Sequence, residues 1–259
     1  MRFGVCAPPD ALESVAAAGF EYLEPSVAGM LQPEHPGTEI MPPLLAQFGV
    51  SRLKPETYNL LLPGDLKVVG PDADSGRQER YLEAAFRRAG QLGGKIAVFG
   101  SGGARRVPAG WPREEAHAQI LAFLTRCGNA SERHGMSVAI EPLNLSECNI
   151  LNSVAEALSF VVELGHPAVG VLSDLYHVTH DGQSYSETRD AGPFLRHVHI
   201  AGLGRRAPIF DDTDYLREYF TVLKGAGYNG RISIECGWDN LAVQAAEARQ
   251  VVGRAWEAA

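Results

Sequence analysis

The sequence predicts an α/β protein built as a single closed (β/α)8 barrel, and three observations favour this fold class. Short apolar runs of β type alternate with amphipathic helical patterns from one end of the chain to the other. Eight such runs can be counted, which is the strand number of a closed parallel barrel. The chain has 259 residues, 45% of them hydrophobic, which suits one barrel or two ordinary domains. Because the alternation of strand and helix patterns shows no domain boundary, we expect one domain over residues 1–259.

The expected strands are short and leave room for a helix between consecutive strands. In chain order they are Arg2 to Ala7, Tyr22 to Glu24, Val50 to Leu53, Lys95 to Phe99, Ser137 to Glu141, Gly170 to Asp174, His197 to Ala201 and Arg231 to Glu235. The runs that lead to Glu141, Asp174 and Glu235 are almost uninterrupted apolar sequence, as expected of parallel strands buried on both faces.

Helical patterns fill the intervals between the strands, with apolar stripes in residues 116–127 and 216–223. Glycines such as Gly19 and Gly135 return the chain from helix to strand, where a left-handed residue ends a helix. Two stretches rich in proline and glycine, Pro25 to Pro43 and Pro63 to Gly76, interrupt the rhythm. Loops that follow barrel strands cover the active site, so these stretches are either substrate lids or flexible spacers.

Four ionisable side chains stand at the ends of expected strands. They are Glu141, Asp174, His199 and Glu235, separated by 33, 25 and 36 residues, each about the length of one strand, helix and strand repeat. Closing such repeats into a barrel brings all four to one mouth. Three carboxylates and one imidazole there predict a metal site. The oxygen-rich set suits Mn²⁺ best or Mg²⁺, with Co²⁺ or Zn²⁺ as alternatives.

A metal site of this kind predicts proton-transfer chemistry next to a carbonyl group. A divalent ion bound to a carbonyl oxygen and its neighbouring hydroxyl stabilises the enediolate that forms when a proton leaves the adjacent carbon. On the fifth and eighth strands, Glu141 and Glu235 face each other across the mouth. One can remove a proton and the other return one on the opposite face, as inversion at that carbon requires. The sequence therefore predicts an isomerase or epimerase of a neutral polyol or carbonyl compound.

Composition excludes several other classes of protein. The net charge of −8 and the lack of a long basic run argue against a nucleic-acid partner. Four scattered cysteines without a CxxC pair fit a reducing compartment, so we expect a cytoplasmic protein. The chain begins without an apolar signal core, and no segment reaches the roughly 18 apolar residues needed to span a bilayer, so we expect no membrane partner.

The segment from Ile140 to Glu147, IEPLNLSE, resembles the xylose isomerase-like TIM barrels, the sugar phosphate isomerase/epimerase superfamily. Within them, the chain is most similar to ketose 3-epimerases of the D-tagatose and D-psicose type, strongly over residues 137–238 and weakly elsewhere. The resemblance implies that Glu141 is metal ligand and acid/base and that Glu147 contacts substrate. It also implies metal-dependent carbohydrate metabolism on a ketose or sugar phosphate, in a homodimer or homotetramer.

The other motifs of the resemblance follow in chain order. Asp174 and His177 form an Asp-x-x-His pattern, which implies a metal ligand and a substrate contact. Arg205 follows His199 at the spacing of the family's substrate-binding arginine, and Glu235 is implied as the second acid/base. Two departures fall where substrate is held: Leu145 replaces an arginine, and Pro208 to Asp212 replaces a Pro-Gly-x-Gly segment.

Several alternatives stay open at this point. Glu147 either contacts substrate or caps the helix expected from Ser153, and His197 is either an outer partner of His199 or a hydrogen-bonded residue one layer lower. The loop from Gly100 to Arg106 either holds a phosphate or carboxylate with its amides and two guanidiniums or is a Gly-rich turn with solvated arginines. We expect Cys6 and Cys236, at the ends of the neighbouring first and eighth strands, to be reduced thiols lining an apolar pocket.

Alternative functions share the scaffold. The same enediolate can expel a β-hydroxyl group, so a dehydratase of an inositol-type or shikimate-type substrate is the main alternative. A DNA-repair enzyme that resembles endonuclease IV is a distant one, because it needs three zinc ions and histidines at earlier strand ends. The segments Pro55-Glu56-Thr57 and Phe99-Gly100-Ser101 contain no histidine.

Overall fold

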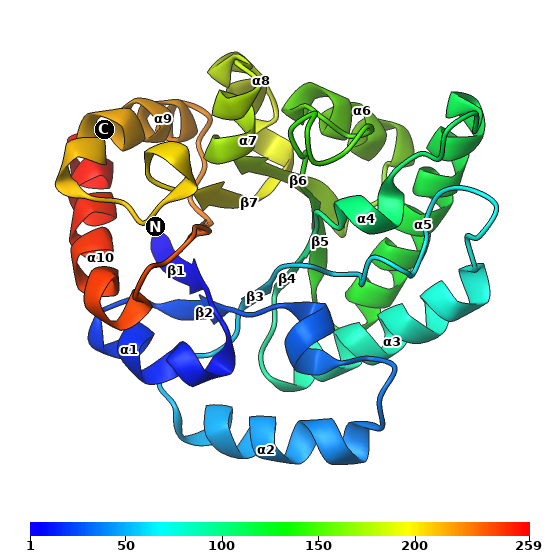
Figure 1. Cartoon of the computed structure of the whole chain (residues 1–259), viewed down its shortest axis with the longest axis horizontal. Coiled ribbons are helices and arrows are strands. Elements are labelled where there is room, and N and C mark those ends of the chain that lie inside the picture. The colour runs from blue at the N-terminus through cyan, green and yellow to red at the C-terminus, as the bar shows by residue number, and fades with distance from the viewer.

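The computed structural model describes residues 1–259 and confirms the barrel (Figure 1). Eight parallel strands pair in the order β2-β1-β8-β7-β6-β5-β4-β3. Two isolated parallel bridges, Leu23 with Pro55 and Ser26 with Asn59, join β2 to β3 and close the ring. The strands are β1 (Arg2–Cys6), β2 (Tyr22–Glu24), β3 (Thr57–Tyr58), β4 (Ile96–Phe99), β5 (Ser137–Ile140), β6 (Val169–Asp174), β7 (Leu195–Ile200) and β8 (Arg231–Ile234).

Helices surround the ring of strands, and α2 lies on the outer rim in Figure 1. The α-helices are α1 (Leu12–Ala17), α2 (Gly37–Val50), α3 (Ser75–Gln91), α4 (Gly102–Arg105), α5 (Arg113–Arg133), α6 (Val154–Leu164), α7 (Leu175–His180), α8 (Tyr185–Asp190), α9 (Thr213–Gly225) and α10 (Leu241–Ala258). Short 3-10 turns are η1 (Pro9–Ala11), η3 (Gly192–Phe194), η4 (Leu203–Arg205) and η5 (Phe210–Asp212), and η2 (Val27–Leu31) is a π-helix. None of these helices combines the length and the apolar character needed to span a membrane.

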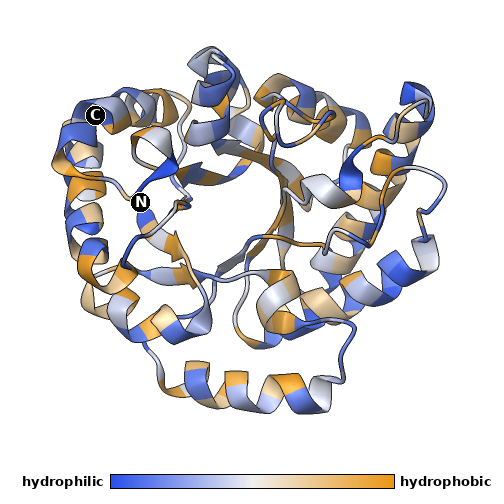
Figure 2. Cartoon of the chain, in the orientation of Figure 1, coloured by the Kyte–Doolittle hydropathy of each residue, from blue (hydrophilic) through white to orange (hydrophobic).

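The strands are buried on both faces, and Figure 2 shows their apolar character. In β4, Ile96 and Val98 pack with Ala139 and Leu172 in a small cluster of their own. The alternate residues Ala97 and Phe99 belong to the large core, where Phe99 packs on Phe123 of α5 with ring centroids 4.9 Å apart. This alternation follows from the twofold period of a strand, which sends successive side chains to the inside of the barrel and to the helical layer.

Seven of the eight expected strands form where the sequence places them, within about two residues at each end. The expected strand from Val50 to Leu53 is wrong. Val50 ends α2 and is 92% exposed, and the strand forms later, where Thr57 pairs with Ile96 and Tyr58 with Ala97. An apolar run of four residues does not distinguish a strand from the end of a helix.

The two proline-rich stretches are packed against neighbouring elements, which does not fit the alternative of flexible spacers. Pro25 to Pro43 contains the π-helix and the start of α2, and Arg88 of α3 donates to the carbonyl groups of Leu31, Gln32 and His35 at 2.7, 2.6 and 2.5 Å. In the second stretch the side chain of Val68 is buried. The backbone amide of Val68 donates to the Ala104 carbonyl at 2.8 Å. Both stretches are therefore fixed to neighbouring elements.

Candidate metal centre at the carboxyl ends of the strands

The four expected ligands converge at the carboxyl ends of the strands. Glu141 and Glu235 follow β5 and β8 directly, Asp174 ends β6, and His199 lies near the end of β7. Each offers one ligand atom, and these atoms all lie within 4.8 Å of one another. His199 Nδ1 is 3.2 Å from Glu141 Oε1, 3.7 Å from Glu235 Oε2 and 3.9 Å from Asp174 Oδ2. The barrel thus brings together the four side chains that the sequence singles out.

This group fits a divalent cation. Asp174 caps α7 by accepting from the amide of Tyr176 at 2.7 Å through Oδ1, while its Oδ2 is buried without a hydrogen-bond partner. A buried carboxylate oxygen without a donor is costly unless a cation satisfies it. Three oxygen donors and one nitrogen form a ligand set that Mn²⁺ or Mg²⁺ accepts. The residues present therefore make a candidate metal-binding site.

His199 is oriented by Glu24, a residue at the end of β2. Glu24 Oε1 lies 3.0 Å from His199 Nε2 on the side of the ring away from the other three carboxylates. Burial opposes ionisation of Glu24, but His197 and His199 outweigh burial and hold the pKa of this carboxyl well below its usual range. An ionised carboxylate only accepts, so Nε2 carries a proton and Nδ1 faces the candidate site.

The two glutamates of the candidate acid/base pair titrate differently. Burial, together with the nearby carboxylates of Glu141 and Asp174, raises the pKa of Glu235 to about 7. Burial also opposes ionisation of Glu141, but His199, with His177 and Arg105, outweighs burial and lowers the pKa of Glu141. At neutral pH one carboxyl group is therefore ionised while the other exchanges a proton readily, which is how paired carboxyl groups divide acid and base roles.

His177 points a hydrogen-bond donor into the same site. Its Nδ1 accepts from the backbone amide of Asn144 at 3.2 Å and lies 2.9 Å from the Asn144 side-chain Nδ2. The proton must then sit on Nε2, which is buried without a hydrogen-bond partner between Glu141 and Asp174, at 4.0 and 3.9 Å. His177 thus presents a donor to the site, whereas His199 presents a nitrogen that can accept a cation once it has lost its proton.

Arg205 and Glu147 form the rim of the site. Arg205 donates to Glu147 Oε1 at 3.1 Å and to Glu235 Oε2 at 3.0 Å, and its guanidinium lies 4.6 Å from the ring centroid of Tyr176. Glu147 does not cap α6, because Ser153 accepts from the first-turn amide of that helix. Both side chains therefore lie at the rim of the candidate site, next to Glu235.

The site opens into a cavity of about 290 Å³. Its lining includes Glu141, Glu147, Arg205 and Glu235, with Leu60 and the loop from Gly100 to Gly103. A neighbouring cavity of about 420 Å³, lined by Cys6, Glu24, Met30 and Asn59 among others, shares Leu60 as a wall. Cys6 thus lines a pocket as expected, and all four cysteines are free thiols. At the departures from the family pattern, Leu145 is 68% exposed and lines neither cavity.

The loop after β4 does not hold an anion with its guanidiniums. Arg105 is wholly buried and donates to the carbonyl groups of Phe99, Glu141 and Leu151 at 2.8, 2.7 and 3.2 Å. Arg106 donates to the carbonyl of Glu147 at 2.6 Å. The hypothesis that these two guanidiniums grip a phosphate is therefore wrong, and so is the view of Arg105 as a solvated residue.

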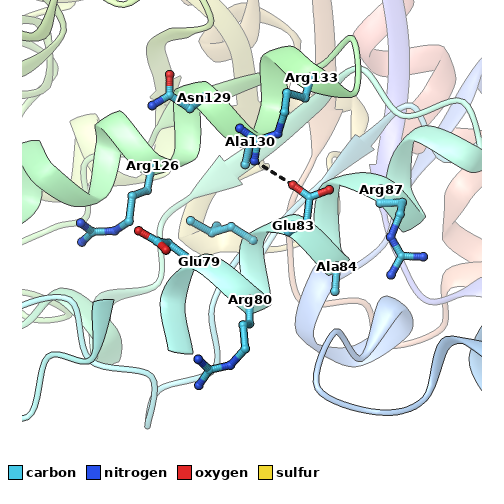
Figure 3. A pocket seen from close by; sticks show the side chains of 10 residues that line it. Glu79, Arg80, Glu83, Ala84, Arg87, Arg126, Asn129, Ala130 and Arg133 are labelled. Carbon is cyan, nitrogen blue, oxygen red and sulfur yellow. Dashed lines mark hydrogen bonds and ion pairs between the residues drawn. The ribbon is translucent and has the colours of Figure 1, made fainter. Parts of the chain in front are cut away.

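A larger hollow of about 580 Å³ lies outside the barrel, between α3 and α5 (Figure 3). Arginines and glutamates line it, and they pair with each other, as Arg133 does with Glu83 at 2.7 Å. None of the strand-end residues reaches it. Its size therefore does not make it the centre of the chemistry.

Two residues of the site were not predicted from the sequence. Glu24 closes the run Tyr22-Leu23-Glu24 just as Glu141 closes its own strand, so the same pattern of an acid after an apolar strand could have found it. Asn59, whose Nδ2 donates to Glu235 Oε1 at 3.4 Å, follows the misplaced third strand and gave no such signal.

Fold and site together define a class of barrel proteins that place ionisable side chains from several strands at one mouth. The family model described as "Xylose isomerase-like TIM barrel" matches residues 12–256, and the chain belongs to this family. The resemblance seen in the sequence is thereby confirmed.

Individual relatives are similar over parts of the chain. A ketose 3-epimerase of Arthrobacter globiformis is 30% identical over 119 residues, 46% of this chain and 41% of the relative. A D-psicose 3-epimerase of Agrobacterium fabrum is 32% identical over 102 residues, 39% and 35% of the two chains. The chain thus spans less than half the length of these two relatives. The structure of a D-allulose 3-epimerase from Methylomonas sp. matches with a TM-score of 0.81 over 98% of both chains at 21% identity, which supports the fold.

Proposed function

We propose that this chain is a metal-dependent epimerase that inverts the carbon next to the carbonyl group of a ketose. The observation that carries the proposal is the placement of Glu141 and Glu235, from β5 and β8, within one candidate cation site. The relatives named as ketose and D-psicose 3-epimerases support the same reaction class.

The proposed mechanism uses the two glutamates on opposite faces of a flat intermediate. One carboxylate removes the proton from the carbon beside the carbonyl, leaving an enediolate, and the other carboxyl group returns a proton to the opposite face of that carbon. A divalent ion held by Glu141, Asp174, His199 and Glu235 would stabilise the charge that develops on the enediolate oxygens. Because the reaction is reversible, the two glutamates exchange roles with direction.

The remaining side chains hold the substrate in this mechanism. His177 donates from Nε2 to a substrate oxygen close to Glu141, since that nitrogen has no partner within the protein. Glu147 and Arg205 bind hydroxyl groups at the rim, and Arg205 also keeps Glu235 in place. We propose an unphosphorylated ketose as substrate because the guanidiniums of Arg105 and Arg106 are occupied by backbone carbonyls.

Manganese is the proposed ion, since the carboxylate-rich set with one imidazole suits it. Four free cysteines fit a reducing compartment, which supports the cytoplasm as the proposed location. A homo-oligomer, dimer or tetramer, is proposed from the family resemblance, and light scattering coupled to size-exclusion chromatography tests it.

A panel of ketoses and their phosphates, incubated with the Mn²⁺-loaded protein in D₂O and followed by NMR, tests the proposed function. We expect deuterium at C3 of a free ketose and formation of its C3 epimer, with loss of both after chelation and recovery on adding Mn²⁺. The dehydratase alternative gives the absorbance of an enone instead. If no ketose exchanges its C3 proton with any of Mn²⁺, Mg²⁺, Co²⁺ or Zn²⁺, the proposed function is wrong.

A further inference from the structure

The side chain of Glu24, at the end of β2, is wholly buried. Its carboxylate meets donors from three other strands. His199 Nε2 lies 3.0 Å from Oε1, and His197 Nε2 and Thr57 Oγ1 each lie 2.7 Å from Oε2. Ser233 Oγ also donates to Oε2. A buried carboxylate with this many donors is held in one orientation.

The two carboxylate oxygens of Glu24 have different hydrogen-bond partners. Three donors converge on Oε2, whereas His199 is the only side chain that hydrogen-bonds to Oε1. His199 faces the other three carboxylates through its second nitrogen, Nδ1, at 3.2 Å from Glu141 Oε1. The hydrogen bond to Glu24 therefore determines which nitrogen of His199 is left to bind a cation.

We propose that Glu24 is a positioning residue that fixes the proton of His199 on Nε2 and so keeps Nδ1 available as the metal ligand. This inference rests on the metal centre of the proposed function. His197 shares the carboxylate and packs edge-on against the ring of His199, with ring centroids 4.9 Å apart, but it is not one of the four candidate ligands. It is fully buried, and its Nδ1 has no hydrogen-bond partner. It is thus the hydrogen-bonded residue one layer lower, and it helps to hold Glu24.

The isosteric variant Glu24→Gln gives a directional test. The amide oxygen takes the place of Oε2, where three donors need an acceptor, so the amide N–H₂ faces His199 Nε2 and donates to it. His199 then carries its proton on Nδ1, pointing at the metal centre. The variant keeps the shape of the side chain while reversing the hydrogen bond, so it separates positioning from packing.

Thr57→Val is the matched control, because it removes one donor from the same carboxylate and leaves the bond to His199 intact. In metal-free protein, ¹⁵N spectra of the histidine side chains are expected to show a protonated Nε2 on His199 in the wild type and in Thr57→Val, and an unprotonated Nε2 in Glu24→Gln. Isothermal titration with Mn²⁺ is expected to give a Kd roughly 10 to 100 times weaker for Glu24→Gln and within about threefold of wild type for Thr57→Val.

The inference is overturned if Nε2 of His199 is unprotonated in the metal-free wild type, a measurement that needs no variant. It is also overturned if a folded Glu24→Gln protein, checked by circular dichroism, binds Mn²⁺ as tightly as wild type. A wild-type protein that binds Mn²⁺ through this centre but epimerises no ketose would contradict the proposed reaction and leave the role of Glu24 standing. The two proposals therefore fail on different measurements.

Discussion

A methyl group added at Gly100 would stand 2.0 Å from Oε2 of Glu141, closer than any real contact. The loop after β4 must therefore carry glycine here for the Glu141 carboxylate to occupy its place. The reason is the close approach of the backbone to a side chain of the metal centre, not the backbone conformation of Gly100, whose φ is not positive.

Gly100→Ala is expected to leave the barrel folded but to displace the Glu141 carboxylate. A misplacement of about 1 Å in a catalytic group costs roughly 100-fold in rate, so we expect at least that loss in kcat/KM and weaker Mn²⁺ binding. Gly103→Ala is the matched control in the same loop, since its nearest contact would be an ordinary 3.4 Å. Equal activity of the two variants would contradict a steric requirement at Gly100.

The affinity for Mn²⁺ is expected to fall with falling pH. Burial opposes the charged form of His199, but Glu24, Cys6 and Glu235 together outweigh burial and raise the pKa of His199 well above its usual range. Burial raises the pKa of Glu235 to about 7 in the metal-free chain. Both groups must lose a proton before they bind a cation, so protons compete with the metal. For each proton that Mn²⁺ must displace, the apparent Kd for Mn²⁺ weakens about tenfold for every pH unit by which the pH falls below the pKa of the protonated group.

Isothermal titration at several pH values from 5.5 to about 8.5 measures this competition. We expect a steeper dependence below pH 7, where Glu235 also takes up a proton, and a net release of protons on binding, seen by repeating the titration in buffers of different ionisation enthalpy. A Kd that stays constant across this range would show that neither group is protonated in the metal-free protein.

Glu235→Gln is expected to preserve the fold and abolish turnover. The amide cannot transfer the proton, and loss of a general acid or base lowers kcat by about 100-fold to 10,000-fold. Deuterium exchange at the substrate carbon should fall with turnover if Glu235 removes the proton. A variant that exchanges deuterium and epimerises at the wild-type rate would rule out the two-glutamate scheme. The exposed Glu247→Gln on α10 controls for the substitution itself.

Arg105→Met is expected to destabilise the protein by roughly 2 to 4 kcal/mol, because three buried carbonyl groups lose their charged donor. Denaturant unfolding of metal-free protein measures the difference. Arg106→Met is the adjacent control, with one hydrogen bond on the surface and an expected effect below about 1 kcal/mol. If the Arg105 variant proves as stable as wild type, the cost of burying the guanidinium cancels its hydrogen bonds.

The sequence allowed the barrel and the four converging strand ends to be predicted because both rest on period and spacing. Apolar runs at regular intervals require parallel strands, and residues at the same end of such strands must meet. Glu141, Asp174, His199 and Glu235 lie together for that reason. The spacing along the sequence does not predict which side chain hydrogen-bonds to a metal ligand from the other side. The contact between Glu24 and His199 was therefore found only in the structure.

The predictions for the third strand and for the loop arginines were wrong for different reasons. Val50 to Leu53 is apolar, but a short apolar run also suits the end of a helix, and the strand at Thr57 and Tyr58 is only two residues long. Arg105 was expected to face a ligand or solvent because arginine is seldom buried. The carbonyl groups of Phe99 and Glu141, at the ends of β4 and β5, and of Leu151, in the loop before α6, accept from its guanidinium and make its burial tolerable. No local sequence pattern predicts these contacts.

Only isolated bridges join β2 to β3, whereas the other neighbouring strands pair in ladders. We call this boundary between β2 and β3 the seam. Glu24 of β2 spans this seam, because its carboxylate accepts from Thr57 of β3 as well as from His199 of β7. We therefore expect ring closure and assembly of the candidate metal centre to be thermodynamically linked through this side chain. Loading the ion should therefore protect the backbone amides of β2 and β3 from hydrogen exchange.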